Sequence, residues 1–120
     1  MIVTMSTNAK RLLGVIRVLR SVDPEMPLLY AGIFMEVGVR SPHPYMLNEV
    51  PETFGVSRAT ASRAHAYLSS YLVNTGLTKK PGLGLIRSEA SPANRRCLEL
   101  TLTAKGKAVY EQVMNALDKK

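Results

Sequence analysis

The stretch from Glu49 to Arg63, EVPETFGVSRATASR, decides the fold of this chain of 120 residues. Its first half predicts a short helix that is capped by Asn48 and ends at about Phe54. Pro51 then falls at the third helical position, where its missing N–H removes no hydrogen bond, because the first-turn donors of a helix have no partner within it. The glycine and valine that follow predict a tight turn.

A second helix is expected from Arg58 to Leu72, with Ser57 as its N-cap, because a serine hydroxyl can accept a hydrogen bond from a first-turn N–H. The residues expected to point inward are Ala61, Ala64, Leu68 and Leu72. The residues expected to point away from the core are Arg58, Ala59, Thr60, Ser62, Arg63, Ala66 and Tyr67. The sequence therefore predicts two helices joined by a tight turn, with a small, polar and basic outer face on the second.

A β-hairpin is expected downstream of these helices. Turn-forming residues at 74–76 and 81–84 lead into expected strands at 84–88 and 97–102, and apolar and polar residues alternate in the second strand as in a half-buried strand. Between the strands lies a polar tip from Glu89 to Arg96, which carries Arg95 and Arg96. Arg87 lies on the first strand, where it is expected to contact phosphate.

Three further helices complete the predicted layout. Residues 10–22 carry an apolar stripe at helical spacing, formed by Leu12, Val15, Ile16, Leu19 and Val22. Residues 27–37 are apolar nearly all round, which is typical of a central, buried helix, and a loop is expected from Gly38 to Pro44. Thr103 is expected to cap a final helix that begins at Ala104.

The net charge of +7 is concentrated in one part of the chain. Residues 57–96 carry seven basic residues and only Glu89 as an acid, a net of +6, whereas residues 1–56 sum to 0 and residues 97–120 to +1. A clustered basic surface attracts polyanions, of which nucleic acid and membrane headgroups are examples; a merely solvated charged face is the alternative.

Other classes of function find little support in the sequence. The single Cys97 excludes an intrachain disulfide and Cys-pair motifs, which suits a reducing cytoplasm, and the longest apolar run, residues 26–35, is too short to cross a bilayer. No secretory signal, glycine-rich phosphate loop or hydrolase motif is found. We therefore expect no catalytic residues, no metal site and no cofactor, and a cytoplasmic location at the nucleoid.

A helix pair followed by a basic β-hairpin is the layout of a winged helix-turn-helix, a mainly helical α+β fold whose second helix enters the major groove of DNA. Small side chains at its start allow close approach, and arginines at the helix start and hairpin tip can reach phosphates, bases or the minor groove. The expected DNA-binding residues are Ser57, Arg58, Ala59, Thr60, Ser62, Arg63, Tyr67, Arg87, Arg95 and Arg96. For Tyr67, packing between the helix and the hairpin is an equal alternative.

The same residues resemble the MarR (multiple antibiotic resistance regulator) family of transcription factors. Residues 49–63 are similar to its helix-turn-helix, and Asn94-Arg-Arg96 followed by Leu102-Thr-Ala-Lys-Gly106 is similar to its wing motif, Asp-x-Arg followed by Leu-Thr-x-x-Gly. The resemblance covers roughly residues 27–117. It implies that Arg96 is the wing-tip arginine, that residues 57–63 begin the recognition helix, and that double-stranded DNA is the partner of a homodimer.

Two departures from the family pattern affect these expectations. Asn94 replaces the usual Asp, so an ion pair made by that Asp would become a neutral contact. Little chain follows Ala104, so we expect one domain over residues 1–120 whose terminal helices, 8–22 and 104–118, form the dimer. Relatives often respond to small aromatic effectors bound between their dimerisation and DNA-binding parts, and the effector of this chain stays open.

The main hypothesis is a sequence-specific transcriptional regulator, most simply a repressor, that binds a pseudo-palindromic site. The alternative is a winged-helix module that binds a protein in a replication or polymerase-regulating assembly, with the apolar first helix as its docking face.

Overall fold

The computed structural model of the chain describes residues 2–70, 72–75 and 78–118, with side chains for residues 7–70 and 81–118. The helices are α1 (Ile2–Val22), α2 (Leu28–Arg40), a 3-10 turn (Leu47–Glu49), α3 (Val50–Phe54), α4 (Arg58–Leu68) and α5 (Ala104–Asp118). The strands are β1 (Tyr45–Met46), β2 (Leu72–Thr75), β3 (Thr78–Pro81), β4 (Ile86–Ala90) and β5 (Leu98–Leu102). The predicted fold, mainly helical with a small β-hairpin wing, is confirmed.

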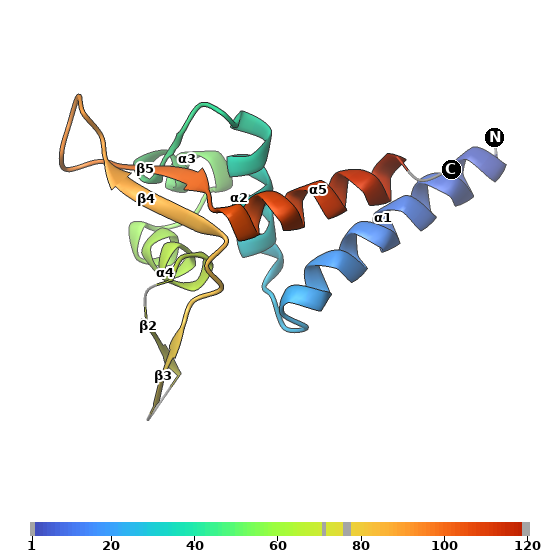
Figure 1. Cartoon of the computed structure of the whole chain (residues 1–120), viewed down its shortest axis with the longest axis horizontal. Coiled ribbons are helices and arrows are strands. Elements are labelled where there is room, and N and C mark those ends of the chain that lie inside the picture. Colours follow the sequence, from blue (N-terminus) through green and yellow to red (C-terminus); the bar gives the residue numbers. More distant parts are fainter. Residues whose placement is uncertain (1, 71, 76–77, 119–120) are drawn as a thin grey trace.

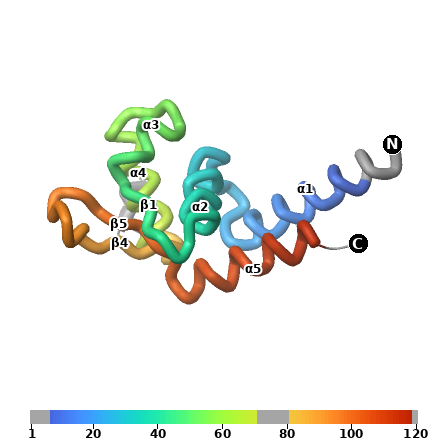
Figure 2. Tube along the Cα trace, turned by 90° about the horizontal axis from the view of Figure 1, so that it is seen from above, coloured from blue at the N-terminus to red at the C-terminus, as the bar shows by residue number. Residues whose placement is uncertain are grey.

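The wing is the outer part of a three-stranded antiparallel sheet with the order β1-β5-β4. Figure 1 shows this sheet, α3 and α4 at one end of the molecule, while α1 and α5 extend from it toward the other end. The two long helices lie side by side in both views (Figures 1 and 2). A second, separate pair of antiparallel strands, β2 and β3, projects from the end of α4.

The hydrophobic core lies between α2, α4 and the sheet. Phe34 and Val37 of α2 are fully buried there, and they belong to one cluster with Leu68 of α4 and Leu100 of β5. The predicted inward stripe of α4 is confirmed at Ala61, Ala64 and Leu68. The central position predicted for α2 is also confirmed, although its two ends reach the surface and expose Leu28 and Val39.

Several predicted helix boundaries were wrong. α1 begins at Ile2 instead of Lys10, because residues 2–9 contain no helix breaker and a helix can continue beyond the face that it buries. α2 includes Gly38, which was predicted to be in a loop; the ring of Tyr110 packs closely beside it, and the helix ends before Ser41.

The short helix of the pair also differs from its prediction. Asn48 lies within the 3-10 turn and is not the cap of α3, so Pro51 occupies the second helical position instead of the third. The predicted tight turn is confirmed, because Gly55 adopts the left-handed conformation with φ 65° and ends α3.

The region after α4 holds the largest error. α4 ends at Leu68, not at Leu72, and the turn predicted at 74–76 is partly strand β2, with Gly76 outside the described residues. Strands β2 and β3 were not predicted, and neither was the two-residue β1. Strand β4 begins two residues later than predicted, at Ile86, while β5 and α5 lie close to their expected bounds.

The inner face of α1 is shifted from the predicted stripe. Val15 is buried, and Val18, Leu19 and Val22 are partly buried against the core. Leu12 and Ile16, which were predicted to point inward, are exposed by 58% and 42%. The reason is that α1 packs chiefly against α5, a single helix, and so buries only a narrow face. No helix among the described residues is long and apolar enough to span a membrane.

Thr103 and Gly106 join the wing to α5. The Thr103 hydroxyl accepts the backbone N–H of Gly106 at 2.9 Å, which confirms the predicted cap, and it donates to the carbonyl of Gly84 at 2.6 Å. A Cβ atom at position 106 would lie 1.9 Å from the carbonyl oxygen of Leu85. Only glycine therefore allows α5 to begin so close to the start of β4.

We predict that Gly106→Ala lowers the free energy of unfolding by about 2 kcal/mol or more, because the added methyl group overlaps backbone that cannot move freely. Chemical denaturation measures this loss. Gly14→Ala is the matched control in α1, where a Cβ would meet only the Ala116 side chain at 3.4 Å, so it should not destabilise the protein and should raise the free energy of unfolding by up to about 1 kcal/mol through the higher helix propensity of alanine. Equal effects of the two substitutions would contradict this packing.

Candidate nucleic-acid interface

The start of α4 is held by a network of side-chain hydrogen bonds. Ser57 is the predicted N-cap and accepts the backbone N–H of Thr60 at 3.1 Å, while its hydroxyl donates to the Thr60 hydroxyl oxygen at 3.0 Å. Arg63 donates to that same oxygen at 3.1 Å. Because the Thr60 oxygen already accepts two hydrogen bonds, its own O–H can act toward a ligand only as a donor.

The outer face of α4 is exposed and basic, as predicted. Arg58, Ala59, Ser62 and Arg63 are exposed, and Thr60 is half-buried. Neither Arg58 nor Arg63 forms an ion pair with any carboxylate in the described part of the chain. Two fixed positive charges on a helix start with small neighbours can approach an anionic surface closely.

The tip between β4 and β5 presents Arg95 and Arg96, which are both exposed and without an ion pair among the described residues. Asn94 shapes this tip, because its side-chain oxygen accepts the backbone N–H of Arg96 at 3.1 Å. An amide oxygen can accept this bond as a carboxylate oxygen does, so Asn94 positions the backbone of Arg96 without needing a charge.

The structure brings the helix start and the wing together around one hollow of about 560 Å³, which we call the helix–wing hollow. Its wall includes Arg58 and Ser62 from α4 and Arg96 from the wing. Pro51 and Leu98 belong to the same wall. Residues 34 positions or more apart in sequence therefore form one basic surface.

Two contacts that the sequence did not reveal fix the wing beside α4. His65 of α4, which is only 8% exposed, lies 3.0 Å from the hydroxyl of Ser88 on β4. Asn48 donates to the sulfur of Cys97 at 3.2 Å. Burial lowers the pKa of His65, which favours the neutral form of its ring. No local pattern marks such pairs, because their members lie 23 and 49 residues apart.

Two of the predicted DNA-binding residues, Tyr67 and Arg87, bond to carboxylates of the chain itself. Tyr67 points toward the junction of α1 and α2, where its hydroxyl donates to Asp23 and its ring lies 4.9 Å from that of Tyr30. Burial and this hydrogen bond raise the pKa of Tyr67 above its ordinary range. Arg87 is exposed but forms an ion pair with Glu89, which offsets its charge locally.

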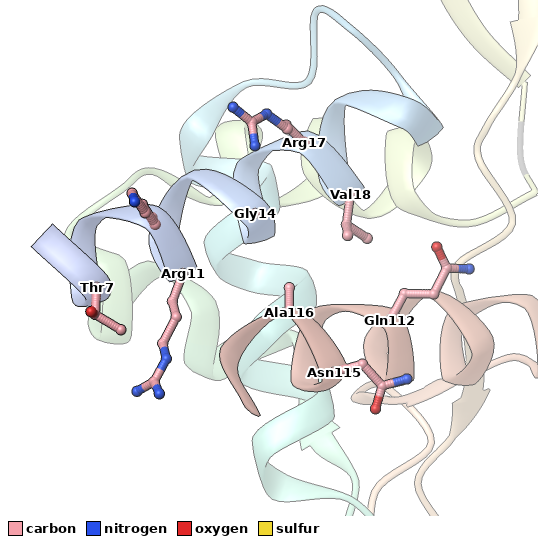
Figure 3. Close-up of a pocket in the computed structure, with 9 residues that line it drawn as sticks. Thr7, Arg11, Gly14, Arg17, Val18, Gln112, Asn115 and Ala116 are labelled. Atoms are coloured by element: carbon pink, nitrogen blue, oxygen red, sulfur yellow. The ribbon is translucent and has the colours of Figure 1, made fainter. Parts of the chain in front are cut away.

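A second hollow, of about 1020 Å³, lies between α1 and α5, and we call it the terminal-helix hollow. Figure 3 shows Val18 of α1 pointing toward α5 and Ala116 of α5 pointing toward α1, while Arg11, Arg17 and Gln112 also line the hollow. The sequence did not predict this hollow, because the packing of two helices that are distant in sequence creates it.

The fold matches known structures more clearly than the sequence does. No model of a protein family matches the chain, and neither does any curated protein. Transcriptional regulator Tm0710 from Thermotoga maritima is 20% identical, with a TM-score of 0.67 over 97% of this chain and 68% of its own. MarR is 17% identical, with a TM-score of 0.61 over 98% of this chain and 72% of its own.

The chain has the MarR fold. Reduced AbfR, whose solved structure is bound to DNA, shares this fold at 18% identity, with a TM-score of 0.61 over 98% of this chain and 75% of its own. Identities this low establish the architecture alone. The helix–wing hollow lies between α4 and the β4–β5 hairpin, which carry the exposed Arg58, Arg63, Arg95 and Arg96.

We predict that Tyr67→Phe lowers the free energy of unfolding by about 1 kcal/mol, because it removes a partly buried hydrogen bond to a carboxylate. Its affinity for duplex DNA should stay that of the natural protein, since the hydroxyl is already bonded to Asp23. Denaturation and a DNA-binding titration measure the two effects. A loss of DNA affinity without a loss of stability would return Tyr67 to the DNA-binding surface.

Proposed function

We propose that this protein is a sequence-specific DNA-binding transcriptional regulator of the MarR type, which acts as a repressor by occupying a pseudo-palindromic site as a homodimer. The observation that carries the proposal is the helix–wing hollow, where Arg58 and Ser62 of α4 lie beside Arg96 of the wing. The DNA-bound structure of AbfR, with the same fold, supports it. Such a protein would act at the nucleoid in the cytoplasm.

In this proposal α4 enters the major groove with its N-terminal residues leading. Arg63 is the residue best placed to read a base, because its hydrogen bond to Thr60 limits its freedom and a guanidinium can pair with a guanine edge in two bonds. Arg58 and Ser62 contact phosphate at the groove edge. Arg95 and Arg96 follow the backbone into the neighbouring minor groove, where arginine is favoured.

The homodimer is proposed to form through α1 and α5. Leu12, Leu13 and Ile16 on α1 are exposed by 58%, 49% and 42%, and Leu117 on α5 by 39%. Large apolar side chains that gather on one region of a protein surface mark an interaction site. In a two-fold symmetric dimer, these four residues of one copy pack against the same four residues of the second copy. The same symmetry places two copies of α4 so that each can enter one half-site of the DNA.

The same exposed face on α1 favours the alternative function, a winged-helix module that docks on another protein. The two functions differ in their partner. The regulator forms a dimer of one chain and selects a DNA sequence. The module instead binds a different protein in stoichiometric amounts and binds DNA without sequence preference.

We predict that Arg63→Ala reduces the preference for the selected site over random duplex by about 1–3 kcal/mol, that is, by roughly tenfold to a hundredfold or more. Arg96→Ala should instead weaken binding to both duplexes alike and reduce the slope of log K against log salt by about 0.9 for each protomer bound. Titrations at several salt concentrations separate these effects. Lys107→Ala, an exposed charge on α5, is the control expected to change neither. If all three variants bind like the natural protein, this surface is not the DNA interface.

We predict that Leu12→Glu/Ile16→Glu converts the dimer to a monomer in sedimentation experiments, because it places four charges in the apolar contact. The monomer should remain folded, since both side chains are exposed in the single chain. Leu28→Glu is the matched control: Leu28 is 89% exposed at the start of α2, which is not one of the two helices proposed to form the contact, and its substitution should leave the dimer intact. A natural protein that stays monomeric at micromolar concentration contradicts the proposed dimer.

A further inference from the structure

The end of α4 is bonded to the turn that joins α1 to α2. Tyr67, on the last turn of α4, donates its hydroxyl proton to one side-chain oxygen of Asp23, and its ring centroid lies 4.9 Å from that of Tyr30 on α2. The other side-chain oxygen of Asp23 accepts the backbone N–H of Glu25 at 3.0 Å. Asp23 directly follows the last residue of α1. A side chain of α4 is therefore bonded to the end of a helix that is proposed to form the dimer.

This bond joins two helices that otherwise pack against different neighbours. α1 packs chiefly against α5, whereas α4 packs against α2 and α3. In both views α2 lies between α4 and most of the length of α1 (Figures 1 and 2). The backbone of Tyr67 is held as well, because its carbonyl accepts the N–H of Leu83 at 2.8 Å. The Tyr67 side chain therefore relates the position of α4 directly to that of α1.

In the proposed dimer, the separation of the two α4 helices depends on how each is held relative to its own α1 and α5, because those helices carry the two-fold contact. One base pair more or less between the half-sites changes their separation by about 3.4 Å and their relative rotation by about 35°. Each α4 must then move by about 1.7 Å, which is more than an O–H···O hydrogen bond of about 2.5–3.0 Å can absorb. A duplex with the wrong spacing therefore breaks the bond between Tyr67 and Asp23.

We propose that Tyr67 and Asp23 are a positioning pair, which fixes the distance between the two half-sites that the dimer accepts. This inference rests on the proposed function, since it requires two copies of α4 on one duplex. On a duplex of the selected spacing the bond is kept, and on other duplexes it is lost. The pair therefore contributes to the discrimination between spacings and not to the affinity for the selected site, in agreement with the natural affinity expected for Tyr67→Phe.

The test uses three duplexes: the selected sequence, and the same sequence with one base pair removed from or added to its centre. Tyr67→Phe should bind the selected duplex like the natural protein, whereas its loss of affinity on either altered duplex should be smaller by roughly tenfold, since neither subunit has this bond to lose. Tyr30→Phe is the matched control. It makes the same chemical change on the neighbouring ring, leaves the bond to Asp23 in place, and should keep the natural discrimination.

A second variant, Asp23→Ser, removes the other partner of the bond. The serine hydroxyl can still accept the backbone N–H of Glu25, but its side chain is one atom shorter and does not reach Tyr67. Its discrimination between spacings should fall by the same factor as that of Tyr67→Phe. The double variant should fall no further, because the two side chains act through one bond.

The possible outcomes separate this inference from the proposed function. Natural discrimination in both single variants, or an equal loss of affinity for all three duplexes, overturns the positioning pair and leaves the proposed function intact. A natural protein that binds the three duplexes equally well also overturns the pair. A natural protein that selects no symmetric duplex overturns the proposed function, and the positioning pair with it.

Discussion

The backbone of one fully buried residue, Leu85, joins the three parts on which the proposed interface depends. Its N–H donates to the carbonyl of Leu68 at the end of α4, and its carbonyl accepts the N–H of Thr103 at 3.1 Å, at the end of the wing. Gly106 places the first turn of α5 against that same carbonyl. Since buried backbone groups must be paired, a displacement of any one of these parts leaves a donor or acceptor unsatisfied. Helix α4, the wing and α5 are therefore held in a fixed arrangement.

This arrangement explains why the charged residues can be exposed and still well placed. The arginines proposed to contact DNA lie at the start of α4 and at the wing tip, away from the core. The segments that carry them are held in place by the hydrogen bond between His65 and Ser88 and by the backbone hydrogen bonds of Leu85. The exposed arginines contribute little to folding, because exposed charges are solvated and weakly coupled. Their substitution should consequently affect binding without unfolding the protein, which makes the interface open to testing by single changes.

Much of the architecture could be predicted because its determinants are local. Ser57, Gly55 and Thr103 each act within a few residues, as caps or in a turn, and the alternation in β5 marks a strand within one window of sequence. The contacts that set the position of the wing, His65 with Ser88 and Asn48 with Cys97, depend on the tertiary structure and leave no periodic signal. The orientation of Tyr67 toward Asp23 was not predicted for the same reason. A polar face of a helix can contact another part of the same protein instead of a ligand, and the sequence pattern is the same in both cases.

Strands β2 and β3 and the exposed face of α1 show a second limit of local patterns. The sequence predicts helix as far as Leu72 and turn-forming residues at 74–76, whereas the structure has two strands that pair with each other from Leu72 to Pro81. On α1 an apolar stripe predicts burial, but it does not show whether the surface that covers the stripe belongs to the same chain or to a second copy. The proposed homodimer depends on two copies of α4 binding one duplex.

The measurement that tests this claim most directly is the selection of sequences bound by the purified protein from a pool of random duplex DNA. The account predicts enrichment of one sequence with two-fold symmetry, whose half-site centres are separated by about one helical turn, roughly 34–36 Å. A pool that stays random after several rounds, or enrichment of a single half-site by a monomer, would contradict it.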